Sequence, residues 1–162
     1  CRPDRRKASS GFQGLFIDDE PMVELMEACR DLGLLVLVHG GMDVSFPHCH
    51  HCTPERIARI LPAGGLTLVL AHLGGYNYLD DVERLLVGKD LYLDTSFTLG
   101  RFGREQILRI IRNHRPDRLL FGTDSPWDDQ QSAVSAVKDL PIDASLKDKI
   151  LYENAAGLLK LE

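Results

Sequence analysis

Leu34-Leu35-Val36-Leu37-Val38-His39-Gly40-Gly41 is an uninterrupted apolar run that ends in a histidine and two glycines. Continuous apolar runs, unlike alternating ones, are typical of strands that are covered on both faces, as in parallel sheets. The two glycines allow a sharp backbone turn after His39 and leave room for a ligand beside it. The run therefore predicts a buried parallel strand with a polar side chain at its carboxyl end.

Similar apolar runs recur later in the chain, namely Leu66-Thr67-Leu68-Val69-Leu70-Ala71, Leu91-Tyr92-Leu93 and Leu119-Leu120-Phe121. Helical periodicity separates the runs. It predicts helices over residues 22–32, 53–61, 78–87 and 104–113, and further helices over 131–138, 144–151 and 153–159. Because a connection between parallel strands needs a crossover, this alternation predicts an α/β protein with a parallel sheet.

Two architectures fit the alternation, an open parallel sheet and part of a (β/α)8 barrel. A complete barrel takes about 250 residues, whereas this chain has 162. We therefore expect residues 11–162 to form about half of a barrel. Residues 1–10 carry a cluster of basic side chains and are expected to form a solvated, disordered tail.

Composition excludes several classes of protein. The net charge of -5 argues against a general nucleic-acid binder. No apolar run approaches the roughly 20 residues of a membrane-spanning helix. The amino end has no apolar stretch of the kind that signal peptides contain, so a cytoplasmic location is expected. The four cysteines are too few and too scattered for a secreted disulfide scaffold.

A polar side chain of the kind that binds metals follows each apolar run, and these residues are His39, His72, Asp94 and Asp124. The carboxyl ends of parallel strands form the active face of barrels and open sheets, so we expect the four side chains to converge. Histidine and aspartate together suit a divalent cation such as zinc or manganese. Such a cation can activate water or polarise a carbonyl group.

These motifs resemble, in order, the later strands of the amidohydrolase-related family of metal-dependent barrel enzymes. Residues 31–41 resemble the fifth strand of that family, residues 70–75 the sixth, residues 91–96 the seventh and residues 117–127 the eighth. Residues 151–156, with the sequence Leu-Tyr-Glu-Asn-Ala-Ala, resemble the closing helix. The resemblance implies a partial (β/α)8 barrel built from strands five to eight. It also implies hydrolysis, or non-oxidative decarboxylation, of a small carboxylated or amide substrate.

The resemblance also implies roles for individual residues. His39 would be a metal ligand, and His72 would be a ligand or the acid/base that holds the reactive water. Asp124 would bind the metal and help to deprotonate that water. The implied metal is zinc, with manganese as the alternative. Asp94 has no fixed role in the family and is either a residue that supports the ligands or a strand cap.

The chain departs from the family pattern at its amino end. In the family, a His-x-His pair on the first strand supplies two more ligands, whereas here His39 is the first histidine of the chain. From this we expect a truncated or frame-shifted gene, or a cut fragment. A catalytically inactive half-barrel that serves as a binding or assembly module is therefore the alternative to an enzyme. Open strand edges and an apolar inner face then predict a homodimer.

The loop His48-Cys49-His50-His51-Cys52 is a second candidate metal site, because thiolates and imidazoles are the preferred ligands of zinc. Its Cys-x-x-Cys could also be a redox pair. The competing interpretation is a polar surface loop with adventitious affinity for metal, and a small Cys/His zinc protein ranks last among the hypotheses. His114, at the end of a predicted helix, is expected to interact with the helix dipole.

Overall fold

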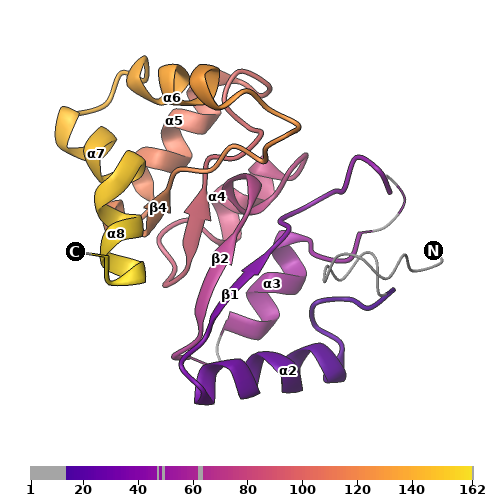
Figure 1. Cartoon of the computed structure of the whole chain (residues 1–162). Coiled ribbons are helices and arrows are strands. Elements are labelled where there is room, and N and C mark those ends of the chain that lie inside the picture. The colour runs from indigo at the N-terminus through magenta and orange to yellow at the C-terminus, as the bar shows by residue number, and fades with distance from the viewer. Residues whose placement is uncertain (1–13, 47, 49, 62–63, 162) are drawn as a thin grey trace.

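A computed structural model describes residues 14–46, 48, 50–61 and 64–161 of the chain, so the tail expected over residues 1–10 lies outside the described residues. The strands are β1 (Leu35–Val38), β2 (Thr67–Leu70), β3 (Tyr92–Asp94) and β4 (Leu119–Leu120). They pair in parallel as one four-stranded sheet in the order β1-β2-β3-β4 (Figure 1). The predicted α/β architecture with parallel strands is therefore confirmed.

Helices connect the strands and follow the last of them. They are α2 (Glu20–Asp31), α3 (Pro54–Ile60), α4 (Leu79–Leu85), α5 (Arg104–Asn113), α6 (Gln130–Lys138), α7 (Ala144–Asp148) and α8 (Asn154–Leu159). Shorter helical turns are η2 (His72–Gly74), η3 (Pro116–Arg118) and η4 (Lys149–Glu153), the last of which is π-helical. No helix in the described part of the chain has the length and apolar character needed to cross a membrane.

Local signals explain where the first two helices begin and end. Gly33 ends α2 in the left-handed conformation, with a φ of 66°, and lets the Leu34 N–H donate to the Cys29 carbonyl. Pro54 opens α3, a position that suits proline because the first turn of a helix leaves its backbone nitrogens without hydrogen-bond partners. The preceding Thr53 is the N-cap residue, but its side chain makes no capping hydrogen bond.

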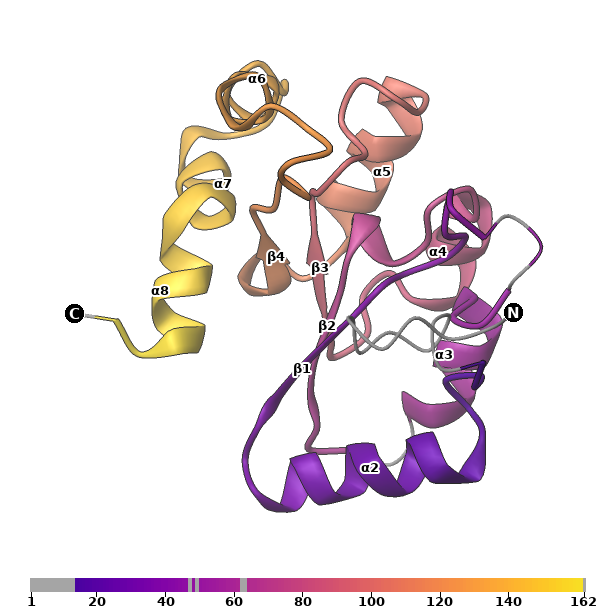
Figure 2. The ribbon, with the colours of Figure 1, turned by 45° about the vertical axis from the view of Figure 1, so that its right-hand side comes forward.

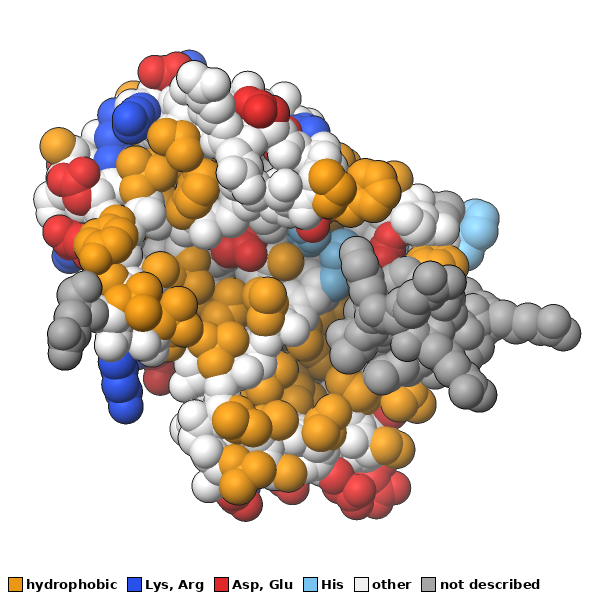
Figure 3. Space-filling model, in the orientation of Figure 1, with side chains coloured by type: hydrophobic (Ala, Val, Ile, Leu, Met, Phe, Trp, Pro, Cys, Tyr) orange, Lys and Arg blue, Asp and Glu red, His pale blue; other side chains and the backbone are white. Residues whose placement is uncertain are grey.

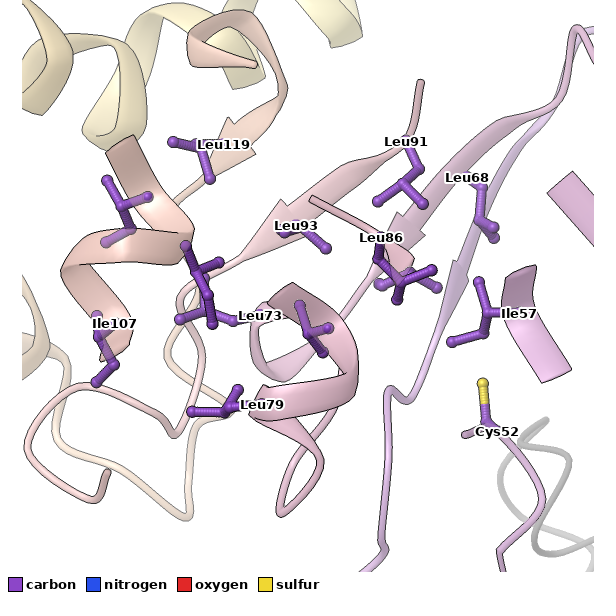
Figure 4. Close-up of a cluster of buried hydrophobic side chains, with 14 of the residues drawn as sticks. Cys52, Ile57, Leu68, Leu73, Leu79, Leu86, Leu91, Leu93, Ile107 and Leu119 are labelled. Carbon is purple, nitrogen blue, oxygen red and sulfur yellow. The ribbon is translucent and has the colours of Figure 1, made fainter. Parts of the chain in front are cut away.

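One side of the sheet is buried against the helices. Leu68 and Leu70 of β2, Leu93 of β3 and Leu119 of β4 belong to the main core cluster. Side chains from α3, α4 and α5 complete this cluster, including Ile57, Leu79 and Ile107 (Figure 4). Figures 1 and 2 show these three helices on the same side of the sheet. Burial of this outer side supplies most of the apolar contacts that hold the fold together.

The other side of the sheet, here called the inner face, is only partly covered. Leu35 and Leu37 of β1 alternate with Val36 and Val38, which pack against the core, and they are 39% and 59% exposed. Figure 3 shows hydrophobic side chains gathered in front of the sheet, below the histidines. Strands of a closed barrel are covered on both faces, so this exposure is the expected property of a partial barrel.

His114 has a different role from the one predicted. It is buried, its Nε2 donates to the Leu91 carbonyl at 3.0 Å, and its Nδ1 accepts from the Gly88 N–H at 3.1 Å. The ring thus ties the end of α4 to the start of β3, and it must be neutral to accept through Nδ1. Burial lowers the pKa of His114 below its ordinary 6.5, and the nearby guanidinium group of Arg115 acts in the same direction.

This buried imidazole should make stability fall in mildly acidic solution. Above pH 6.5 the ring is neutral in both folded and unfolded chains, so its full contribution is present. Below that pH the unfolded chain binds a proton that the folded chain resists, and the free energy of unfolding decreases. We expect His114→Ala to lower the free energy of unfolding at pH 7.5 by about 2–4 kcal/mol, because two backbone groups lose their partner.

Urea denaturation at several pH values between 7.5 and 5 would measure both effects. The loss of stability on acidification should be smaller in His114→Ala than in the unaltered chain. The exposed His48 provides a matched control, since His48→Ala should leave stability and its pH dependence unchanged. If His114→Ala keeps the original pH dependence, a different group is responsible for it.

Candidate functional site

The strand register brings His39 and His72 into contact. Val38 at the end of β1 pairs with Leu70 at the end of β2, so the residues that follow leave the sheet at the same level. The two imidazole rings lie 4.7 Å apart between centroids, and His72 Nε2 is 3.1 Å from His39 Nδ1. The predicted convergence of these two histidines, which are far apart in the sequence, is thereby reproduced.

Close packing of glycine backbones fixes this geometry. The Tyr76 N–H donates to the Gly40 carbonyl at 2.8 Å, and the Met42 N–H donates to the Tyr76 carbonyl at 3.0 Å. A Cβ atom on Gly40 would lie 2.5 Å from the Ala71 carbonyl oxygen, and one on Gly41 would lie 2.3 Å from the Tyr76 nitrogen. Neither position can hold a side chain unless the backbone moves, so the glycines after His39 are required for close approach.

Asp94 and Ser96, which follow β3, hold His72 in place. Asp94 Oδ1 accepts from the His72 N–H at 3.0 Å and from the Ser96 N–H at 2.9 Å. The Ser96 carbonyl lies 3.0 Å from His72 Nδ1. These bonds stabilise the positive φ of 60° at His72, which is unusual for a residue with a side chain. Of the two roles considered for Asp94, the geometry corresponds to support of His72, while Ser96 was not singled out from the sequence.

The hydrogen bonds of His39 and His72 leave one nitrogen of the two rings, His39 Nε2, without a partner. The Ser96 carbonyl can only accept, so His72 Nδ1 donates to it, and in a neutral ring His72 Nε2 then carries a lone pair. His39 Nδ1 then donates to that lone pair, which leaves His39 Nε2 as an acceptor. His39 Nε2 is buried and makes no hydrogen bond with any described group. Buried polar atoms usually have partners, so this atom is a candidate metal ligand.

The electrostatic surroundings favour the neutral form of His39. Burial lowers the pKa of His39 below its ordinary value, and proximity to His72 lowers it further. The Met42 backbone and the carboxylates of Asp43 and Asp124 act in the opposite direction but do not reverse the shift. A neutral imidazole has the lone pair that a metal requires, so no proton has to be displaced from His39 at neutral pH.

Asp124 follows β4 at the same edge of the sheet but is less closely associated with the histidines. It is exposed, takes a φ of 61°, and is near enough for its charge to influence His39. Among the described residues, no three His, Cys, Asp or Glu side chains are grouped closely enough to hold a metal ion. The donors therefore fit a divalent cation in their chemistry and protonation, but they form only part of a ligand set.

Aromatic rings that the sequence analysis did not single out surround His72. Tyr76 and Phe97 lie 6.0 Å and 6.5 Å from its ring, and Phe102 contacts Tyr76 at 5.0 Å. The Arg101 guanidinium stacks over Phe97 at 3.8 Å and pairs with Asp128 at 3.1 Å. The segment after β3, together with Tyr76 after β2, thus builds an apolar wall with a cationic group beside the histidines. In the sequence, the close spacing of Phe97 and Phe102 is the feature that could have indicated this wall.

A search with sequence profiles of protein families gives the decisive comparison. The profile described as Amidohydrolase matches residues 7–161. This chain belongs to the amidohydrolase family. A search of curated protein sequences finds no significant match.

Solved structures with the same fold are TIM barrels and amidohydrolases. A TIM-barrel protein of Bordetella bronchiseptica is 26% identical, with a TM-score of 0.71 over 90% of this chain and 52% of the other. A dihydroxybenzoic acid decarboxylase of Polaromonas, with bound manganese and 2-nitroresorcinol, is 19% identical, with a TM-score of 0.64 over 91% and 56% of the two chains. The 5-carboxyvanillate decarboxylase of Sphingomonas paucimobilis is 17% identical, with a TM-score of 0.67 over 95% of this chain and 57% of the other. The chain thus spans a little more than half the length of these barrels, which confirms the predicted partial (β/α)8 fold.

The loop before α3 does not form a compact metal cluster among its described residues. His51 is buried and packs edge-on against Phe16. The Arg56 guanidinium lies over the same Phe16 ring. Cys52 is buried, and burial raises the pKa of its thiol to about 12, so the reactive thiolate is disfavoured. His50 bonds instead to the Tyr78 hydroxyl. Cys49 lies outside the described residues, so the Cys-x-x-Cys considered as a redox pair stays an untested possibility of the sequence.

Packing at Gly41 should be testable through a matched pair of glycines. Gly41 and Gly100 both have positive φ, of 90° and 81°, but only Gly41 lacks space for a Cβ atom. We expect Gly100→Ala to cost about 1–2 kcal/mol through its left-handed backbone alone. Gly41→Ala should cost at least about 1 kcal/mol more, because its Cβ overlaps the Tyr76 backbone. Equal losses in urea denaturation would show that the contact does not constrain the site.

Proposed function

We propose that this chain provides part of a divalent metal site with which an amidohydrolase hydrolyses or decarboxylates a small carboxylated or amide substrate. The observation that carries the proposal is the unpaired, buried lone pair of His39 Nε2 beside His72. Membership of the amidohydrolase family supports the reaction class. His39, His72 and Asp124 are the proposed ligands, and His72 would bind through Nε2 only when that atom no longer accepts from His39 Nδ1. His72 and Asp124 are the proposed catalytic residues.

Each of these residues would have a separate task. His39 offers a neutral nitrogen, and Ser96 orients His72 by accepting from its Nδ1, so that Nε2 points toward His39. The exposed carboxylate of Asp124 is able to accept a proton from water at the mouth of the site. A bound divalent cation would supply Lewis acidity, which polarises a substrate oxygen and lowers the pKa of water.

Manganese and zinc are both suitable metals for imidazole and carboxylate ligands. Manganese is supported by its presence in the dihydroxybenzoic acid decarboxylase structure and in that of 5-carboxyvanillate decarboxylase from Novosphingobium aromaticivorans. Those two proteins act on aromatic carboxylates, as their names state. The rings of Tyr76, Phe97 and Phe102 would suit a planar substrate of this kind, which supports decarboxylation over amide hydrolysis.

A second candidate function is a binding or assembly module without catalytic activity. It is favoured by the absence, within the described residues, of a third ligand grouped with His39 and His72. A catalytic metal usually has three protein ligands and one open position. The two functions differ in turnover, whereas both allow weak metal binding by the histidine pair.

Metal titration with a matched histidine control would test the proposal. We expect calorimetry to show Mn²⁺ or Zn²⁺ binding to the chain at pH 7.5, weakened at least about tenfold by His39→Ala, as is typical when a ligand is lost. His50→Ala, in the loop cluster, should leave the affinity unchanged. If His50→Ala abolishes binding while His39→Ala has no effect, the metal is held by the loop, and the proposed site is wrong.

A further inference from the structure

We infer that Arg101 selects aromatic carboxylates as ligands, because its guanidinium binds the carboxylate group beside the histidine pair. The geometry of the segment after β3 carries the binding itself. That the bound aromatic acid is the substrate of this chain rests on the proposed function. Arg101 would thus be a residue that determines specificity, in addition to the residues proposed for the metal and for catalysis.

Arg101 lies one aromatic ring away from the histidines. Its Cζ atom is 3.8 Å from the centroid of the Phe97 ring, and the centroid of that ring is 6.5 Å from the centroid of His72. Arg101 follows β3, which has a neighbouring strand on each side within the sheet. A ligand that reaches His72 along the aromatic wall therefore meets a positive charge at a defined place.

The local backbone holds Arg101 in this position. Thr98 is fully buried, its hydroxyl donates to the Thr95 carbonyl at 2.8 Å, and its own carbonyl accepts from the Arg101 N–H at 3.1 Å. Phe97 has a φ of 51°, in the left-handed region that residues with a Cβ atom rarely adopt. Such backbone conformations are concentrated at ligand sites, where the surrounding structure maintains them. The segment therefore resembles a built site more than a plain surface loop.

Two contacts orient the guanidinium and leave one of its sides for a ligand. One face lies on Phe97, and Nη1 donates to Asp128 Oδ2 at 3.1 Å. Asp128 is itself held, because its Oδ1 accepts from the Asp129 N–H at 3.0 Å. Within the described residues, Nε and Nη2 of Arg101 donate to no other group. These two nitrogens form a planar fork that matches the two oxygens of a carboxylate.

The rings beside this fork favour an aromatic acid over other anions. Tyr76 lies 5.8 Å from Phe97 with an angle of 34° between the rings, and Phe102 contacts Tyr76 edge-on at 5.0 Å. A further planar ring can extend such tilted and edge-on arrangements. Phosphate also suits a guanidinium fork, but it has no apolar body that could contact the wall. The ligand class that uses both features is an aromatic ring with a carboxylate.

Titration with benzoate, followed by two-dimensional ¹H–¹⁵N NMR without metal, tests this inference. Trp127 is the only tryptophan of the chain and is adjacent to Asp128, so its single indole signal reports on the site together with the amides of residues 97–101. We expect benzoate to shift these signals, and uncharged benzamide to bind at least about tenfold more weakly. Arg101→Gln should weaken benzoate binding at least about tenfold. Arg101→Lys should weaken it less, because lysine keeps the charge but lacks the fork.

Arg118 provides a matched control for these variants. Its guanidinium also lies over an aromatic ring, that of Tyr92 at 4.6 Å, and it also pairs with an aspartate, Asp117, at 3.0 Å. Arg118 directly precedes β4 and therefore lies at the amino end of the strands, opposite the histidines. Arg118→Gln should leave the affinity for benzoate unchanged. Circular dichroism would establish that all three variants remain folded.

Three results would overturn the inference: no shift with benzoate, equal binding of benzoate to Arg101→Gln and to the unaltered chain, or binding of benzamide or inorganic phosphate as tight as that of benzoate. The last two results would leave Arg101 with the role of joining two loops through Asp128. Mn²⁺ separates the inference from the proposed function, since Arg101→Gln should bind Mn²⁺ as the unaltered chain does. If benzoate binding depends on Arg101 while Mn²⁺ binding does not depend on His39, only the proposed metal site is wrong.

Discussion

The close contact between the backbone after β1 and the backbone after β2 is the constraint on which the site depends. Gly40 and Gly41 approach Ala71, Gly74 and Tyr76 so closely that no Cβ atom fits between the two segments. This contact brings the carboxyl ends of both strands to one level and places the rings of two distant histidines together.

Packing on the outer side of the sheet makes this contact stable. Helices α3, α4 and α5 cover Leu68, Leu70 and Leu93, and at about 25 cal/mol per Å² of apolar surface this burial is the main source of stability. The inner side contributes less, since Leu35 and Leu37 keep contact with water. Exposure on that side is confined to the edge strand β1, since Val69 of β2 and Leu120 of β4 are buried.

Protonation connects the packing to the chemistry. Burial and the neighbouring His72 keep His39 neutral, and the Ser96 carbonyl determines which nitrogen of His72 carries the proton. Since each neutral ring has one donor and one acceptor, a chain of two rings that begins at a carbonyl must end in a lone pair. Hydrogen bonding and desolvation therefore leave a buried nitrogen with an unpaired lone pair, which is the kind of donor that the proposed metal site requires.

Sequence alone determined the elements and their order. Apolar runs located the strands, and helical periodicity located most of the helices. The positions of His39, His72, Asp94 and Asp124 after the strands identified them as one group. These features depend on local pattern, which a sequence carries directly. Tertiary structure decided how close the members of the group come. It joined His39 and His72, used Asp94 to support His72, left Asp124 exposed, and turned His114 and His51 into buried packing residues. Those outcomes depend on distances between segments that lie 20 to 50 residues apart, roughly the spacing of successive strands in a crossover fold, and no local pattern encodes such distances.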